Sequence, residues 1–88
     1  YSPGIPIRLN VKKVKNREAY LSFKKMKTNK SNCYFLSKKG DLKEAAKNLY
    51  STLRKIKKDK YISIAVGKIP NKSFGKVIND RLKRASKF

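Results

Sequence analysis

The sequence predicts a small α/β domain with a mostly parallel sheet flanked by helices. In its second half, short apolar segments alternate with amphipathic helical segments, in the order strand, helix, strand, helix. A right-handed crossover through the first of these helices makes the two strands that it joins parallel. The length of 88 residues limits the chain to one domain whose core comes from a few elements.

The N-terminal segment, residues 1–6, is expected to be the end of a linker. It reads YSPGIP, and two prolines and a glycine in so short a stretch disfavour a regular element. Residues 7–88 then form a single domain. Its first half offers three strands, at residues 7–10, 19–23 and 32–37, with a polar, basic loop before the third. That third segment is apolar almost throughout, so we expect it to be covered on both faces.

The first helix is the strongest local pattern in the chain. Asp41 occupies the N-cap position, and Glu44 three residues later completes a capping box. Apolar residues at three- and four-residue spacing fall along one stripe of the helix. They are Leu42, Ala45, Ala46, Leu49, Leu53 and Ile56. The helix is expected to end in the charged segment at residues 57–60.

A buried strand and a second helix are expected to follow. The strand covers residues 61–69, with Ile62, Ile64 and Val66 as its β-branched centre, and a proline ends it. The helix covers residues 74–86 and carries its own apolar stripe. That stripe consists of Phe74, Val77, Ile78, Leu82 and Ala85.

Arg81 falls near the middle of the second stripe. A guanidinium on a core-facing stripe keeps its charge, so it must be paired or reach water. Either its stem packs while its head reaches a carbonyl or a carboxylate such as Asp41, or the residue holds the linker or faces another domain. Both interpretations predict that Arg81→Ala is costlier than Lys83→Ala, because a buried pair would lose one partner.

The charge balance is the strongest signal in the composition. The chain has 25 Lys and Arg against 5 Asp and Glu, a net charge of +20. Four cations of the first helix fall on one side, away from its apolar stripe, and such a track suits an RNA backbone. They are Lys43, Lys47, Arg54 and Lys58. The alternative is the codon bias of an AT-rich genome, because lysine outnumbers arginine 20 to 5, whereas phosphate recognition favours arginine.

The composition argues against several kinds of chemistry. With no His and one Cys, the chain has no Cys–His pair, no imidazole metal site and no internal disulfide. Its five acids do not repeat at a spacing typical of paired acid–base catalysis. We therefore assign no catalytic residue, no metal ligand and no cofactor to this chain. Cys33 is expected to be a small core residue.

Two further segments bear on location and on ligands. The longest apolar run, residues 62–66, is too short to span a membrane, and a lone cysteine fits a reducing compartment, so we expect a cytoplasmic protein. The segment from Gly67 to Gly75 leads from a strand into a helix, as a phosphate-binding loop does. Its spacing does not match that motif, and Val77 stands where the motif needs a hydroxyl. A looser anion site at the helix N-terminus stays open.

Two blocks of sequence carry a resemblance to a known family. Residues 36–50 read LSKKGDLKEAAKNLY, and residues 69–70 and 75–85 read IP and GKVINDRLKRA. Together with the opening YSP, they resemble the C-terminal domain and linker of the long, two-domain threonylcarbamoyl-adenylate synthases. The family often has Pro at the position of Lys38, an acid at Asn71 and Gly at Ser73.

The resemblance implies a small Rossmann-like accessory domain without catalysis of its own. The family makes threonylcarbamoyl-adenylate and pyrophosphate from ATP, bicarbonate and L-threonine, for the modification of tRNA. Its N-terminal catalytic domain, of the YrdC type, would be the partner of this chain and would hold ATP and Mg²⁺. The linker, here Tyr1, Ser2 and Pro3, would lie over the mouth of that domain's active site.

In the second block, Asn79, Asp80 and Arg81 are the candidates for the surface that faces the catalytic domain.

Two alternative functions of the chain remain open. The chain could be a stand-alone basic RNA-binding module of the same fold, with tRNA as a partner. It could also be a purely structural docking domain.

Overall fold

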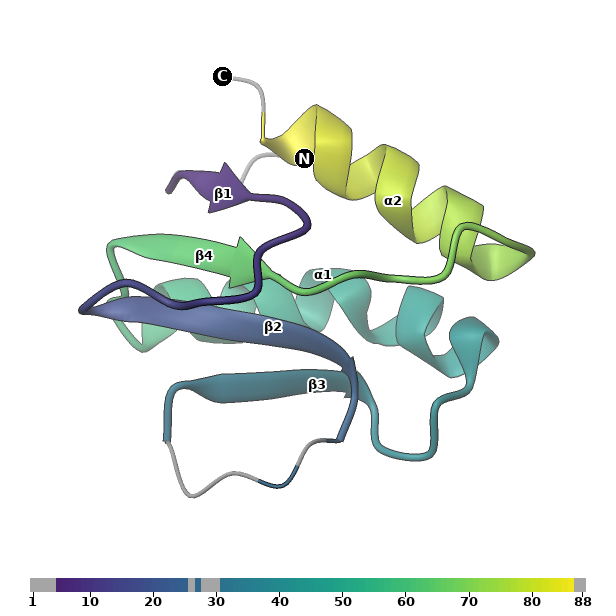
Figure 1. Cartoon of the computed structure of the whole chain (residues 1–88), viewed down its shortest axis with the longest axis horizontal. Coiled ribbons are helices and arrows are strands. Elements are labelled where there is room, and N and C mark those ends of the chain that lie inside the picture. Colours follow the sequence, from purple (N-terminus) through teal and green to yellow (C-terminus); the bar gives the residue numbers. More distant parts are fainter. Residues whose placement is uncertain (1–4, 26, 28–30, 87–88) are drawn as a thin grey trace.

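A computed structural model describes residues 5–25, 27 and 31–86, which form a four-stranded parallel sheet and two helices (Figure 1). The elements in chain order are β1 (Ile7–Arg8), β2 (Glu18–Lys24), β3 (Cys33–Ser37), α1 (Leu42–Lys58), β4 (Ser63–Val66) and α2 (Phe74–Ala85). The predicted α/β class is therefore confirmed. Tyr1, Ser2 and Pro3, the predicted linker, lie outside the described residues.

The sheet has the strand order β1-β4-β2-β3, so the last strand of the chain lies in the interior of the sheet. Ile64 of β4 pairs with Ile7 on one side and with Ala19 of β2 on the other. The crossover from β3 through α1 to β4 leaves these two strands parallel, as the strand, helix, strand pattern predicted. The sequence alone did not give the strand order.

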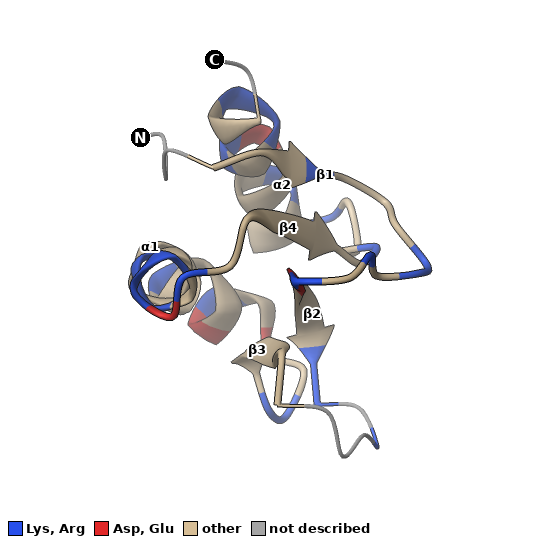
Figure 2. Ribbon diagram, turned by 90° about the vertical axis from the view of Figure 1, so that its left-hand side faces the viewer, with Lys and Arg blue, Asp and Glu red and all other residues tan. Residues whose placement is uncertain are grey.

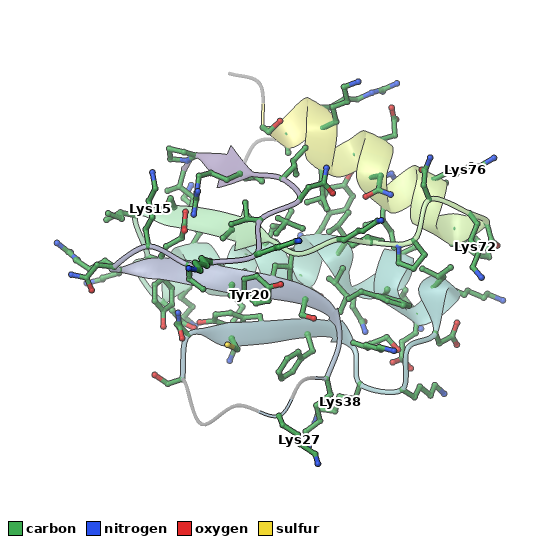
Figure 3. The ribbon with its side chains drawn as sticks, in the orientation of Figure 1. Lys15, Tyr20, Lys27, Lys38, Lys72 and Lys76 are labelled. Atoms are coloured by element: carbon green, nitrogen blue, oxygen red, sulfur yellow. The ribbon has the colours of Figure 1, made fainter. Side chains whose placement is uncertain are left out.

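The core lies between one face of the sheet and the two helices (Figure 2). Alternate strand residues point into it, and they meet the apolar stripes of both helices. The buried contributors include Leu21, Leu36, Ile64, Val66, Leu49, Leu53, Ile56, Ile78 and Leu82. Tyr20 lies on the opposite face of the sheet (Figure 3), where its hydroxyl occupies the space that a Cβ on Gly67 would need.

β3 departs from its prediction because it is an edge strand. Of the described strands it pairs with β2 alone, and Cys33, Tyr34 and Phe35 at its start are half-buried. The expectation that both of its faces are covered was wrong, since both described helices pack on a single face. Cys33 accordingly lies outside the core that it was expected to join.

β4 is shorter than predicted. It begins at Ser63, so Ile62 precedes the strand and stays 52% exposed instead of joining the core. The Ile62 N–H donates to the carbonyl of Arg17 at 3.2 Å, which ties this residue to the turn before β2. The periodicity of the segment identified a strand but not where it starts.

The N-terminus of α1 has the predicted N-cap, but Ser37 takes the place of the direct bond from the Asp41 N–H to Glu44 that a capping box has. Asp41 accepts a hydrogen bond from the Lys43 N–H at 2.9 Å, as an N-cap does. The Asp41 N–H donates to Ser37 Oγ at 2.9 Å, and that hydroxyl donates to Glu44 at 2.8 Å. Ser37 thus bridges the two acids of the expected capping box and ties the helix start to the end of β3.

α2 is rotated about its axis relative to the predicted stripe. Its buried residues are Gly75, Ile78, Leu82 and Ala85, while Phe74 and Val77 are 44% and 40% exposed. The reason lies at Gly75, where an added Cβ would collide with the carbonyl oxygen of Pro70. Only glycine allows the helix to approach the preceding connection so closely, and this approach turns Phe74 outward.

Candidate docking surface and buried ion pair

The rotation of α2 creates an apolar and cationic surface on the outer side of the two helices. Phe74, Val77 and Arg81 follow each other along α2 at spacings that place them on one side of the helix. The Arg81 guanidinium lies over the ring of Tyr50 of α1, 5.5 Å from its centroid. We call Tyr50, Phe74, Val77 and Arg81 the α1–α2 face.

A depression of about 480 Å³ lies in this surface. Tyr50 and Val77 contribute apolar walls, and Arg81 and Arg84 contribute cations. Exposed apolar residues beside an arginine that stacks on an aromatic ring are typical of protein interfaces. The α1–α2 face is therefore the part of the described surface that most resembles a docking site.

Arg81 does not face the core, as the predicted stripe required, whereas the alternative that it faces another domain stays a prediction. It is exposed, and its neighbour is the Tyr50 ring instead of Asp41, whose carboxylate caps α1. The prediction failed because the stripe was drawn through Phe74 and Val77, which the structure places outside the core. A cation over an aromatic ring at an exposed site stabilises by about 0.5–1 kcal/mol, far less than a buried pair.

The two residues before Arg81 have separate structural contacts. The Asn79 side-chain amide donates to the Ile69 carbonyl at 3.1 Å and to Asn71 Oδ1 at 3.4 Å, which fixes the connection before α2. Asp80 forms an exposed ion pair with Arg84 at 3.3 Å. The structure therefore spreads Asn79, Asp80 and Arg81 over different contacts.

The predicted basic track on α1 is present as an exposed surface. All four of its members are exposed on the helix. Figure 2 shows several blue stretches of lysine and arginine along α1. The four members are Lys43, Lys47, Arg54 and Lys58. Their exposure is compatible both with RNA contact and with a solvated surface.

The most strongly perturbed acid is one that the sequence analysis did not single out. Glu18, at the start of β2, has a fully buried side chain and forms a two-pronged pair with Arg8 of β1, at 2.6 and 2.9 Å. Its carboxylate also accepts hydrogen bonds from the Lys15 N–H at 2.9 Å and from Ser63 Oγ at 2.7 Å. Four hydrogen bonds therefore hold one buried carboxylate.

The pair spans the strand that lies between its two partners. Arg8 is in register with Ala65 of β4, and Glu18 is in register with Ser63. Because these two β4 residues are small, the longer side chains can meet above them on the face of the sheet away from α1. An isolated acid at the start of an apolar strand, in a chain with few acids, is the signal that could have revealed it.

The hydrogen bond from Arg8 is the largest cause that lowers the pKa of Glu18, from 4.5 to about 2. The bonds from Lys15 and Ser63 act in the same direction, and burial opposes them. Glu18 is therefore an anion throughout the physiological pH range, and it has no proton to donate near neutral pH. The arrangement is suited to structure and not to general acid–base catalysis.

Tyr34 is a further group with a perturbed pKa, besides Glu18 and its partner Arg8, whose pKa is raised. Burial is the first cause that raises the pKa of its hydroxyl, and a hydrogen bond to Asp59 adds to the effect. Its ring meets that of Tyr61 edge-on, with centroids 6.1 Å apart.

Among the described residues, no three His, Cys, Asp or Glu side chains lie close enough to hold a metal ion.

These features define a small, strongly basic, all-parallel α/β domain with an exposed docking-type surface. Over residues 1–87 the chain matches the family described as the C-terminal domain of threonylcarbamoyl-AMP synthase, and it belongs to that family. The resemblance of the two sequence blocks is thereby confirmed. No curated protein and no solved structure matches the chain significantly. Neither described helix is long and apolar enough to cross a membrane.

Proposed function

We propose that this chain is the accessory domain of a threonylcarbamoyl-AMP synthase and has no catalysis of its own. Membership of the family supports the link to tRNA modification. The observation that carries the accessory role is the α1–α2 face, which presents apolar and cationic side chains to a partner. ATP, Mg²⁺ and the reaction belong to the N-terminal, YrdC-like domain in this proposal, and the cytoplasm is the expected location.

The partner that this face would contact is the catalytic domain. Covering Phe74 and Val77 with another surface lowers the free energy of the complex, because their apolar area is then removed from water. Arg81 is already stacked on Tyr50, so little side-chain entropy is lost when it is buried further. Tyrosine and arginine at the centre of an apolar patch are frequent hot spots of binding.

The linker remains part of this proposal on the strength of the resemblance. Tyr1, Ser2 and Pro3 would lie over the mouth of the active site of the catalytic domain. Docking through the α1–α2 face would then hold the linker in place, because both ends of the linker would be anchored.

The test uses the two-domain enzyme in which this chain follows its catalytic domain. The double variant Phe74→Ser, Val77→Ser should lower the rate of pyrophosphate release from ATP, L-threonine and bicarbonate by about tenfold or more, since losing a few hot-spot contacts costs 1.4 kcal/mol or more. The matched control is Lys55→Ser, Lys57→Ser, two exposed residues of α1 outside this face.

The isolated 88-residue chain provides the second measurement. Its melting temperature should be unchanged or higher in the double variant, because the two side chains are exposed there. Loss of activity with an unchanged melting temperature supports docking. Full activity of the double variant would remove the α1–α2 face from the proposal.

A second function, a basic RNA-binding module, is favoured by one observation. Four cations lie exposed along α1, and the net charge of +20 would draw a phosphate backbone to them. They are Lys43, Lys47, Arg54 and Lys58. The sequence encoded upstream of Tyr1 separates the two functions, since a YrdC-like domain there favours the enzyme and an unrelated sequence favours the module.

A further inference from the structure

A crevice of about 470 Å³ opens at the carboxyl ends of β1 and β4. Asn10, Gly67 and Lys68 line it from the strand ends, and Lys76, Asn79 and Lys83 line it from α2. It adjoins the depression beside the Tyr50 ring, with which it shares Lys76 and Asp80. Lys76 projects from the first turns of α2 in Figure 3.

The position of this crevice in the sheet is significant. After β1 the chain passes over the end of β4, where the Val11 N–H donates to the Val66 carbonyl at 2.9 Å, and it continues along the face of the sheet away from α1 (Figure 2). After β4 the chain turns instead toward the opposite face, where α2 packs. Neighbouring parallel strands whose connections leave toward opposite faces form a topological switch point. In open α/β sheets, ligands bind in the crevice at such a point.

The walls of the crevice are held in place before any ligand arrives. Asn79 donates to the Ile69 carbonyl at 3.1 Å, so a side chain of α2 fixes the segment that follows β4. Ile69 is itself only 3% exposed and anchors that segment in the core. A wall that is already rigid loses little entropy when a ligand binds.

The positive charge of the side chains that line the crevice indicates that its ligand is an anion. Three ammonium groups border the crevice, from Lys68, Lys76 and Lys83, and the carboxylate of Asp80 is paired with Arg84 at 3.3 Å. The volume falls within the range of small-molecule sites, about 300–1,000 Å³.

We infer that this crevice binds the phosphate group of a small molecule. Lys68 and Lys83, which line this crevice and not the depression beside Tyr50, would neutralise the doubly charged group, while Lys76 lies at the border with the α1–α2 face. Inorganic pyrophosphate and a nucleoside monophosphate share this chemistry. The site does not depend on the docking proposed above.

The experiment is an NMR titration of the ¹⁵N-labelled 88-residue chain with inorganic pyrophosphate and, separately, with adenosine monophosphate. In ~0.15 M salt, where long-range attraction is screened beyond about 8 Å, we expect saturable shifts at the amides of Gly67, Lys68 and Asn71. Tighter binding of the nucleotide identifies a nucleoside phosphate as the ligand. Tighter or equal binding of pyrophosphate identifies the bare phosphate group.

Two double variants with the same change of charge decide whether the site is specific. Lys68→Gln, Lys83→Gln should weaken binding about tenfold, as expected when two cations are lost near a divalent anion. Lys55→Gln, Lys57→Gln, on the exposed side of α1, should leave the affinity within about twofold, since these charges lie outside the crevice. Circular dichroism confirms that both variants are folded.

Three results would overturn the inference. The first is equal weakening by the two double variants, which would mean a general attraction to the net charge. The second is a shift pattern spread over the whole surface. The third is the absence of saturation with either probe.

Discussion

The buried pair of Arg8 and Glu18 gives the sharpest prediction about stability. We consider Glu18→Gln, which keeps the size of the side chain but removes its charge. The carboxylate accepts four hydrogen bonds in the folded protein, and an amide in its place turns one acceptor oxygen into a donor group. At least one of the surrounding N–H or O–H donors then loses its acceptor in a buried site.

The size of the expected destabilisation follows from the pKa of Glu18. The pKa falls from 4.5 to about 2, which means that folding favours the ionised carboxylate. At 1.36 kcal/mol per pKa unit, the shift corresponds to about 3 kcal/mol of stabilisation. Because the Arg8 side chain is 34% exposed, solvent screening reduces this to about 2–3 kcal/mol. This stabilisation is complete above pH 4.5 and is lost as the pH falls toward 2.

The assay is urea denaturation followed by circular dichroism at pH 7 and at pH 2.5. At pH 7, Glu18→Gln should lose about 2–3 kcal/mol, which lowers the urea midpoint by about 2–3 M for a small domain with a slope near 1 kcal/mol per M. At pH 2.5 most of the difference from the unmodified chain should disappear. The control is Asp80→Asn, which breaks the exposed pair with Arg84 and should cost less than about 1 kcal/mol. Equal losses in the two variants, or a difference that does not change with pH, would refute the reasoning.

Three other predictions concern the helices and the basic surface. Arg81→Ala should cost about 0.5–1 kcal/mol in a thermal melt through loss of its contact with Tyr50, and Lys83→Ala should cost less; a loss above about 2 kcal/mol would restore the buried role first expected for Arg81. Gly75→Ala should destabilise by about 1–3 kcal/mol in urea, because its Cβ meets the Pro70 carbonyl; an unchanged midpoint would contradict the close approach. RNA binding, measured by filter retention, should fall by orders of magnitude between ~50 and ~200 mM salt, whereas a sequence-selective complex insensitive to salt would favour the RNA module.

The first helix was predictable because all of its signals are local. Its apolar stripe, its N-cap and its charged end lie within one continuous segment, and α1 begins at Leu42 and ends at Lys58. The parallel arrangement of β3 and β4 was predictable for a similar reason, since a single helix connects them. Ser37 could not be foreseen in the capping arrangement, because it belongs to the preceding strand.

What the sequence concealed depends on contacts between distant segments. The rotation of α2 follows from the approach of Gly75 to Pro70, which a helical projection does not contain. β3 reads as a buried strand, but the strand order places it at the edge. The ion pair joins β1 to β2 across β4, so Glu18 could be noticed as an isolated acid, but its partner Arg8 could not be identified until the order of the strands was known.

The most direct test of the accessory role is pyrophosphate release from ATP, L-threonine and bicarbonate by three samples. These are the 88-residue chain, its catalytic domain alone, and the two joined in one enzyme. We expect no release above a mock preparation from the first, weak release from the second, and full release from the third. Release by the 88-residue chain alone, or equal rates for the catalytic domain with and without it, would contradict an accessory role.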